Sequence, residues 1–340
     1  MTIPVPERRT REFHGVDADI FEREIRPAGR PAIMRGLVDH WPAVKAGKAG
    51  GRVLADYLAP FTGPQPAPVL STPYDQAGLF FYDETLKGTN FETLPMPLTT
   101  LFQRLLDLRG TERPPSLAAQ SLAEPLAAPG FSAANPPPVP VRGAVARLWI
   151  GNAAVVQTHH DMNDNVACAV AGRRRFTFFP PSQTANLYLG PFERTLAGPL
   201  TSMVRLDAPD YKRFPRFNQA WAEAEMADLE PGDALYIPYM WWHHVQSFDS
   251  FSMLVNYWWN EAPPQLRPME ALIHAMLGVR DLPPEQREAW RSMFDAFVFD
   301  AGQTPGEHLA PSARGMQGQL SQARADHLKA ALAANMTKRS

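Results

Sequence analysis

Two pairs of adjacent histidines have the residue types that bind transition metals. They are His159–His160, which Asp161 follows directly, and His243–His244 further along the chain. Both pairs lie in strand-like sequence, where side chains two residues apart point to the same side of the strand. His159 and Asp161 therefore share one face, and His160 turns to the other. An imidazole and a carboxylate on one face, joined by a distant imidazole, predict a 2-His-1-carboxylate triad, which binds one side of a non-haem Fe(II).

The two histidine pairs can form one site only if the strand that carries the second pair lies beside the strand that carries the first pair. Pro231-Gly232-Asp233 predicts a turn, and the residues after it, up to Pro238, predict a strand. A further turn leads from this strand to the pair. This order is what a closed double-stranded barrel needs to bring a late strand beside an early one. Periodicity alone leaves open whether His243 or His244 is the ligand.

The composition is that of an ordinary globular protein and argues against several kinds of site. The 340 residues are 45% hydrophobic and 20% charged, with a formal net charge of -2. This charge gives no reason to expect nucleic acid or a membrane surface as a partner. The single cysteine, Cys168, excludes an intramolecular disulfide and fits a reducing cytoplasm. The N-terminal residues lack the apolar core of a signal peptide, and no run is long enough to span a bilayer.

The order of the local signals predicts a mainly β fold with flanking helices. The 35 prolines indicate many turns and suit a β-rich fold better than a helical bundle. Strand patterns gather in the middle of the chain, and helical patterns lie before and after them. The predicted strands are 31–36, 68–82, 145–150, 155–161, 166–171, 174–179, 229–238 with its turn, and 251–259. The predicted helices are 17–25, 52–58, 98–108, 268–278, 284–299 and a weaker one near 317–335.

Other stretches set the expected domain organisation. Residues 1–16 are expected to be a loosely held lead-in, and the proline-rich residues 124–140 an exposed loop within a domain. Residues 182–226 are long, aromatic and irregular, and they either cover the mouth of the barrel or form a packed surface excursion. We expect a barrel domain over 1–263 and a helical extension over 264–340.

Several short motifs follow one another along most of the chain. They are Leu148-Trp149-Ile150-Gly151, His159-x-Asp161, Asn165, Gly172–Phe176, Phe179-Pro180-Pro181, Pro231-Gly232-Asp233, His243-His244 and Val255–Trp258. Each motif is weak by itself, and the combination is specific. In this order they resemble the cupin-like JmjC family of Fe(II)/2-oxoglutarate oxygenases, and within that family the asparaginyl hydroxylases.

The resemblance implies a double-stranded β-helix, or jelly-roll, core at about residues 145–260. It also implies that His159, Asp161 and His243 are the iron ligands. The second member of each histidine pair would then pack against the barrel.

The resemblance further assigns residues to a pocket for 2-oxoglutarate. Asn165 and Asn256 match positions that hydrogen-bond the cosubstrate or order the iron site. Trp258 matches a wall of the pocket, a role compatible with core packing. The family usually has a lysine for the far carboxylate of 2-oxoglutarate, and this chain has Arg174, whose guanidinium can pair with a carboxylate through two hydrogen bonds.

Two adjacent arginines are alternative candidates for the role of Arg174. The pocket also differs from the family at other positions. Arg173 and Arg175 flank Arg174 in sequence, but strand alternation points them to the other side. Leu117 stands near a position where the hydroxylases have a tyrosine, and Val156 where they have a threonine. These departures change the surroundings of the far carboxylate and leave the iron triad unaffected.

The resemblance implies an Fe(II)- and 2-oxoglutarate-dependent oxygenase that uses O₂ to hydroxylate a C–H bond. By family analogy the substrate is a peptide or protein side chain, with a small metabolite as the other candidate. The departures at the pocket favour an alternative, a non-redox cupin that binds a metal and a small acid without oxidative turnover. A third interpretation is a cupin isomerase or hydrolase that uses Zn²⁺ or Mn²⁺.

The predicted helices 268–278 and 284–299 carry apolar faces, which include Leu272 and Met276 in the first and Trp290 and Met293 in the second. Packing against the protein's own barrel is the default expectation for such faces. Related hydroxylases use C-terminal helices for dimerisation, so the resemblance also implies a homodimer.

Overall fold

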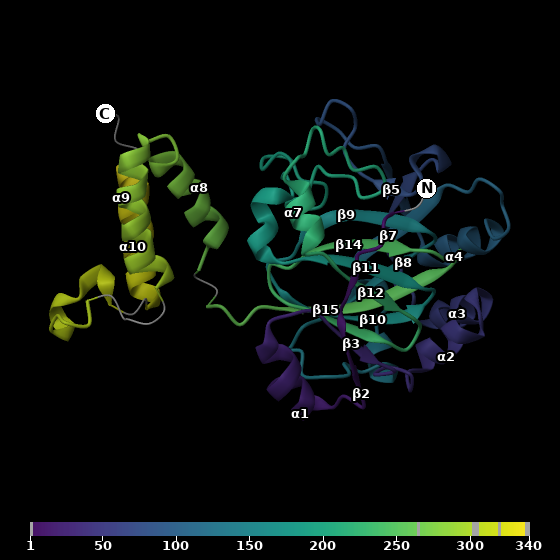
Figure 1. The fold of residues 1–340 in the computed structure, drawn as a ribbon. Helices are drawn as coiled ribbons and strands as arrows, with labels where there is room; N and C mark the ends of the chain where they lie inside the picture. The colour runs from purple at the N-terminus through teal and green to yellow at the C-terminus, as the bar shows by residue number, and fades with distance from the viewer. Residues whose placement is uncertain (1–2, 264–265, 301–305, 319–320, 337–340) are drawn as a thin grey trace. The chain divides into compact units, whose positions relative to one another are not determined.

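In the computed structural model, eight consecutive strands form a barrel core (Figure 1). Four of them, in the order β13-β10-β15-β8, are neighbours in a larger sheet, and β12-β11-β14-β9 are neighbours in a smaller one. This arrangement confirms the predicted jelly-roll core. The strands are β8 (Ala146–Gly151), β9 (Ala154–His160), β10 (Asp164–Ala171), β11 (Arg174–Phe179), β12 (Glu225–Leu229), β13 (Ala234–Ile237), β14 (Trp242–Ser247) and β15 (Ser252–Trp259).

The structure describes residues 3–263, 266–300, 306–318 and 321–336. Parts of the predicted C-terminal extension therefore lie outside the described residues. The chain divides into two compact units, Met1–Asn260 and Glu261–Ser340. A domain boundary at 263/264 stays a prediction.

Seven further strands extend the two sheets. The larger sheet runs β2-β3-β13-β10-β15-β8-β7-β4-β6, and the smaller runs β1-β12-β11-β14-β9-β5. The predicted strands are confirmed, with ends that differ by about one or two residues, except that 68–82 forms two strands, β4 and β5, with a 3-10 turn between them. β6, β7 and β12 had not been predicted. The added strands are β1 (Arg8–Arg9), β2 (Arg11–His14), β3 (Ala32–Arg35), β4 (Ala67–Thr72), β5 (Leu79–Phe80), β6 (Glu92–Met96) and β7 (Ser116–Ala123).

The N-terminal segment is a structural part of the barrel, and the expectation of a loosely held lead-in is wrong for residues 8–14. β1 pairs in parallel with β12 of the smaller sheet, and β2 pairs in parallel with β3 of the larger sheet. The chain thus crosses from one sheet to the other along one edge of the barrel. Exposed charged residues dominate this segment, so it lacks the apolar alternation from which strands are predicted.

Side-chain alternation along the strands separates two hydrophobic clusters. On β15, Leu254 points into the cluster between the sheets, and Met253 and Val255 point into a larger cluster on the outer face of the larger sheet. The period-2 alternation expected of a strand therefore holds along β15. The larger sheet is buried on both faces, which explains why β10 and β15 are apolar on both sides.

Helices cover the outer face of the larger sheet. α2 packs directly on β10, where a Cβ at Gly47 would lie 2.3 Å from the carbonyl oxygen of Val170. Glycine is therefore required at this approach. Leu98, Leu101 and Leu105 form the buried stripe of α4, as their spacing predicts. The helical segments before the barrel are α1 (Ala18–Ile20), a π-turn at Phe21–Ile25, a 3-10 turn at Arg26–Ala28, α2 (Pro42–Ala49), α3 (Gly51–Leu58), 3-10 turns at Ala59–Phe61 and Tyr74–Gln76, and α4 (Leu98–Asp107).

The expectation of an exposed loop at 124–140 is wrong. The stretch contains α5 (Glu124–Ala127) and α6 (Phe131–Ala134), and Phe131 and Asn135 are fully buried. The Asn135 side-chain oxygen accepts a hydrogen bond of 3.0 Å from the Ala43 amide in the first turn of α2. α2 lacks a local side-chain cap, so this distant asparagine supplies one.

Residues 182–226 pack against the smaller sheet. Phe217 and Trp221 of α7 (Phe217–Ala222) both contact Phe179 of β11. The Gln157 side chain of β9 donates hydrogen bonds to the carbonyl oxygens of Ser202 and Val204. Of the two interpretations left open, a packed excursion describes this part of the segment, which also contains a 3-10 turn at Pro181–Asn186.

The C-terminal unit is helical, as predicted. Its elements are α8 (Pro268–Val279), α9 (Pro284–Phe294), a π-turn at Asp295–Phe299, 3-10 turns at Pro311–Ala313 and Gly315–Gln317, and α10 (Gln322–Met336). Among the described residues, no helix combines the length and the apolar character needed to cross a membrane.

Candidate metal centre

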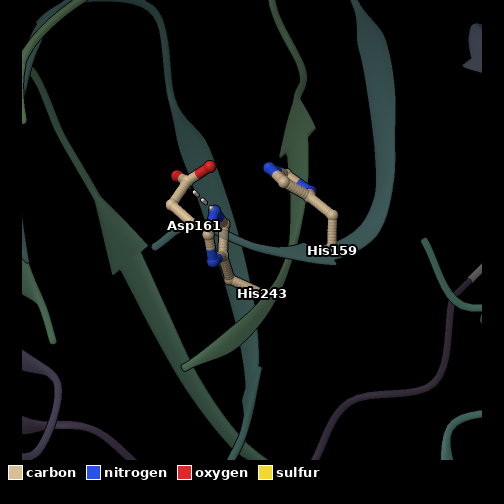
Figure 2. Close-up of side chains that lie close together, drawn as sticks. All are labelled: His159, Asp161 and His243. Carbon is tan, nitrogen blue, oxygen red and sulfur yellow. Dashed lines mark ion pairs between the residues drawn. The ribbon is translucent and has the colours of Figure 1, made fainter. Parts of the chain in front are cut away.

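Two neighbouring strands of the smaller sheet bring three metal-binding side chains together. β9 and β14 are antiparallel, and His159 lies directly opposite His243 in their register. Asp161 follows the end of β9, and Figure 2 shows its carboxylate beside the His243 ring. The Asp161 Oδ2 and His243 Nε2 atoms are 3.7 Å apart, and one ligand atom from each of the three residues lies within 4.8 Å of the others.

A β-bulge sets which side chains of β9 face the barrel interior. His159 pairs with His243, but Val156 pairs with Val245, so β9 has one residue more than β14 between these two pairs. Val156 and His159 are three residues apart and would face opposite sides of a regular strand. The extra residue at Gln157–Thr158 lets both face inward. Bulges commonly redirect side chains beside active sites.

Backbone carbonyls fix the orientation and the tautomer of both histidines. Nδ1 of His159 is 2.8 Å from the carbonyl oxygen of Gln157, and Nδ1 of His243 is 3.0 Å from that of Trp241. A carbonyl oxygen only accepts, so each Nδ1 carries the hydrogen when the ring is neutral. The lone pair is then on Nε2. Such hydrogen bonds orient metal-binding histidines in proteins.

Burial keeps His243 in its neutral, metal-binding form. Its side chain is almost completely buried. This burial is the main reason why the pKa of His243 is well below its ordinary value, and the neighbouring His159 lowers it further. A proton therefore competes weakly with a metal for Nε2.

The other member of each pair packs outside the barrel interior. The His160 ring lies edge-on to Trp242, with centroids 4.5 Å apart. His244 lies opposite Thr177 of β11, is 1% exposed, and neither of its ring nitrogens has a hydrogen-bond partner among the described residues. The structure thus brings His243, rather than His244, to His159 and Asp161.

Arg174 points into the barrel at the far end of the same sheet. It lines a small cavity of about 30 Å³ together with Trp149, Val156 and Val245. Its Nη2 donates a hydrogen bond of 2.8 Å to Ser252, and it has no carboxylate partner among the described residues. Burial lowers the pKa of Arg174 to about 10. An unpaired buried guanidinium is costly, so this end of the barrel favours an anion.

The neighbouring arginines are occupied elsewhere, as strand alternation predicts. Arg173 binds Asp249 on the protein surface. Arg175 makes two hydrogen bonds, of 2.6 and 3.0 Å, to Asp228. Arg174 is therefore the member of the arginine run that faces the cavity.

The remaining candidates form a polar and aromatic group inside the barrel. Asn256 donates to the side-chain oxygen of Asn165 at 3.2 Å and accepts from the Trp149 indole at 2.8 Å. Trp258 lies edge-on to Trp149, with centroids 6.0 Å apart, and Arg147 lies over its ring. Both asparagines are almost fully buried. The side-chain NH₂ group of Asn165 donates to no described residue, so it is available to a ligand.

The expectation that Leu117 lies near this pocket is wrong, and several lining residues, Gln120 among them, had not been predicted. Leu117 packs in the hydrophobic cluster outside the larger sheet, and Gln120 lines the cavity instead. The pairing of β7 with β8 shifts between Ala119 and Leu122, and Ser121 has a positive φ of 53°. The sequence carries no glycine or asparagine signal for this irregularity.

A comparison with protein families decides the classification. Residues 17–265 match the family described as the cupin-like domain. The chain belongs to the cupin-like domain family. The match includes all eight strands of the barrel core and all three residues of the candidate metal centre, and it confirms the resemblance seen in the sequence motifs.

Three kinds of protein are among the relatives to which this chain is similar. The chain is 25% identical to lysine-specific demethylase 8 of Xenopus tropicalis over 269 residues, which are 76% of this chain and 55% of that protein. It is 35% identical to human HSPB1-associated protein 1 over 139 residues, 40% of this chain and 28% of that protein. It is 30% identical to tRNA wybutosine-synthesizing protein 5 of Gallus gallus over 164 residues, 44% of this chain and 46% of that protein. The chain spans about half the length, or less, of these curated relatives.

The two outward-facing histidines predict how stability depends on pH in the metal-free protein. Burial lowers the pKa of His244 to about 3 and that of His160 to about 4, whereas an unfolded histidine titrates near pH 6.5. The unfolded chain binds protons first on acidification, so stability is complete above about pH 6.5 and falls as the pH decreases toward 4. His244→Gln should reduce this slope by about 1.4 kcal/mol per pH unit.

The measurement is urea unfolding of both proteins at several pH values between about 7 and 5. The free energy of unfolding of the wild type should fall more steeply than that of His244→Gln. Equal slopes would contradict a neutral, buried His244.

Proposed function

We propose that this protein is an Fe(II)- and 2-oxoglutarate-dependent oxygenase that hydroxylates a C–H bond. The observation that carries the proposal is the convergence of His159, Asp161 and His243 ligand atoms within 4.8 Å of one another. Two imidazole nitrogens and one carboxylate oxygen are the donor set of the facial triad of non-haem iron oxygenases. Three protein ligands leave positions for a cosubstrate and O₂.

His159, Asp161 and His243 suit iron in the chemistry of their donor atoms as well as in the number of ligands. Both histidines present Nε2 because their Nδ1 atoms donate to backbone carbonyls. When bound, the iron, together with 2-oxoglutarate and O₂, supplies the oxidising chemistry. The protein's own residues hold the metal, orient its ligands and keep water from the site.

Arg174 supports 2-oxoglutarate as the cosubstrate. It would bind the far carboxylate, which supplies the anion that this buried guanidinium lacks, and Ser252 holds it in place. Asn165 and Asn256 would order the ligands between Arg174 and the metal, and Trp258 would form a wall. These assignments rest on burial, hydrogen bonding and the family's motifs.

The substrate we propose is a peptide or protein side chain, with a small metabolite as the second candidate. One relative is named as a demethylase specific for lysine and another as a tRNA wybutosine-synthesizing protein, so relatives differ in what they act on. The net charge of -2 gives no support to a nucleic acid partner. The buried free thiol of Cys168 fits a reducing compartment, and we keep the cytoplasm as the proposed location.

A second candidate is a non-redox cupin that holds a metal and a small acid without turnover, including an isomerase or hydrolase with Zn²⁺ or Mn²⁺. The volume of the Arg174 cavity favours it. At about 30 Å³, the cavity has room for about one water molecule, and 2-oxoglutarate would need side chains to move. A ligand smaller than 2-oxoglutarate needs less movement.

Anaerobic titration of the Fe(II)-loaded protein with 2-oxoglutarate separates the two candidates. We expect a weak visible absorption band that saturates, because the 2-oxo acid chelates the metal. On admission of oxygen, 2-oxoglutarate should be converted to succinate. His159→Ala and Asp161→Ala should lose both the band and the succinate, because each removes one of three ligands.

His40→Gln serves as the matched control, since His40 is exposed and lies outside the site. Full iron binding and turnover in either alanine variant would refute the ligand assignment. Iron binding without a band, even at millimolar 2-oxoglutarate, would instead favour the non-redox cupin.

Arg174→Met tests the cosubstrate assignment separately from the metal. Methionine keeps much of the buried volume and removes the charged hydrogen bonds. We expect the 2-oxoglutarate concentration at half-saturation to rise by about 30-fold or more, equivalent to about 2 kcal/mol, with iron affinity unchanged. An unchanged half-saturation concentration would show that Arg174 does not bind the cosubstrate.

We also propose a homodimer formed through the C-terminal helices. Leu277 of α8, Trp290 of α9 and Phe299 after α9 are exposed apolar side chains, and burying them in a second copy would be favourable. Light scattering at micromolar concentration should give twice the monomer mass. Leu277→Glu should shift the protein to monomer, and a wild-type monomer would refute the dimer.

A further inference from the structure

Arg147 of β8 is a second arginine that faces the barrel interior, and neither the metal centre nor the cavity at Arg174 gives it a role. Its neighbour Leu148 packs in the hydrophobic cluster outside the larger sheet, and Trp149, the next residue, lines the Arg174 cavity. Side chains two residues apart on a strand share a face. Arg147 therefore points to the same side as Trp149, into the barrel.

The strand register places Arg147 toward the metal end of the barrel. At the opposite end, Arg174 donates a hydrogen bond to Ser252, the first residue of β15. Arg147 pairs with Asn256, four residues further along β15, which is about 13 Å along the strand. The end of β15 lies beside the start of β10, which follows Asp161 by three residues. The two interior arginines thus serve different ends of the barrel.

Arg147 is held on two sides, and part of its guanidinium remains available. Nη1 donates hydrogen bonds of 3.1 and 3.2 Å to the carbonyl and hydroxyl oxygens of Ser121. The guanidinium carbon lies 5.5 Å from the ring centroid of Trp258. Among the described residues, no carboxylate pairs with Arg147, and Nε and Nη2 make no hydrogen bond. Two adjacent N–H donors of this kind match the two oxygens of a carboxylate.

An irregularity in β7 provides the support for Arg147. Ala119 pairs with Ile150 and Leu122 with Leu148, so β7 has one residue more than β8 between these pairs. Ser121 lies in this bulge with a φ of 53°. Residues other than glycine rarely adopt this conformation, and they gather at ligand sites. The bulge gives Arg147 two neutral acceptors, so its charge is left for an anion from outside the chain.

The surroundings of Arg147 are reached by solvent. Arg147 and Trp258 are half-buried although they face the interior, as are His159 and Asp161 of the metal centre. Asn256, which pairs with Arg147 on the next strand, is only 1% exposed. The metal centre and Arg147 are therefore both accessible at the same end of the barrel.

We propose that Arg147 binds an acidic side chain of the peptide substrate and so sets the class of peptide that the enzyme accepts. The inference rests on the proposed function, from which it takes the metal centre as the place of reaction. The Trp258 ring and Ser121 fix the plane of the guanidinium, and Nε and Nη2 bind the carboxylate. A carboxylate also supplies the charge partner that this half-buried arginine lacks. A free small acid carries the same group, and the test has an arm for it.

The test is equilibrium dialysis of the full, metal-free chain against a degenerate heptapeptide library. Acetylated amino ends and amidated carboxyl ends leave side chains as the only source of negative charge. Mass spectrometry of the retained peptides should show Asp and Glu enriched over Asn and Gln. The best-retained acidic peptide, measured singly by calorimetry, should bind about tenfold more tightly than its Asn or Gln counterpart.

Two substitutions at Arg147 test the assignment. Arg147→Gln should remove the preference for acidic peptides. Arg147→Lys should retain a weaker preference, because an ammonium group keeps the charge and lacks the planar pair of donors. Arg147→Lys also preserves the charge inside the barrel, so it tests the site even if Arg147→Gln fails to fold. A wild-type preference in either variant would contradict the proposal.

Two control variants locate the peptide. Arg113 also lies over an aromatic ring, that of Tyr74, but it is exposed and outside the barrel. Arg113→Gln should leave the preference unchanged. Arg174→Met should leave it unchanged as well, and a preference lost in Arg174→Met would place the acidic side chain in the cosubstrate pocket and overturn the proposal.

Titration of Arg174→Met with glutarate is the arm for a free small acid. Saturable binding that an added Arg147→Gln removes, without any enrichment of acidic peptides, would assign Arg147 to a small acid and overturn the peptide assignment. A library without enrichment in Asp and Glu overturns it in any case. Neither arm contains iron or 2-oxoglutarate, so a failure here is distinguishable from a failure of the proposed function in the anaerobic titration.

Discussion

The pairing of β9 with β14 is the constraint on which the candidate centre depends. His159 and His243 are distant in sequence, and their side chains meet because the two strands are neighbours with these residues in register. That register is useful only if both side chains face inward, which the bulge at Gln157–Thr158 permits. The carbonyls of Gln157 and Trp241 then direct each Nε2 toward Asp161. Backbone geometry thus sets both the position and the protonation of the donor atoms before a metal binds.

The barrel tolerates polar groups in its interior because a second core stabilises it from outside. The larger sheet is covered by helices over an extensive apolar cluster, and this burial offsets the cost of desolvating Arg174, Asn165 and Asn256 inside. The two asparagines and Trp149 satisfy one another in part. Arg174, with a single serine partner, remains the least compensated of them. The interior therefore favours an anionic ligand at one end and a metal at the other.

The sequence predicts these features to different extents, for identifiable physical reasons. The period-2 pattern of strands places His159 with Asp161 and separates Asn256 from Val255, because alternation is a property of the backbone itself. It does not reveal the bulge in β9 or the irregularity that brings Gln120 into the cavity, since neither has a glycine or proline signal. The strands at residues 8–14 and the buried Phe131 are missed because tertiary pairing and packing, rather than local pattern, determine them.

A row of four residues across the smaller sheet joins Glu225 to the candidate metal centre. Glu225, Phe178, His243 and His159 lie opposite one another on four successive strands, and all face the interior. Phe178 is fully buried and separates the Glu225 carboxylate from the histidines. An apolar spacer here keeps this buried carboxylate apart from the three residues of the candidate metal centre. Trp241 packs on Phe178 beside this row, donates from its indole to the Gly29 carbonyl and accepts from Nδ1 of His243. It therefore links the orientation of the His243 ring to the turn at Gly29.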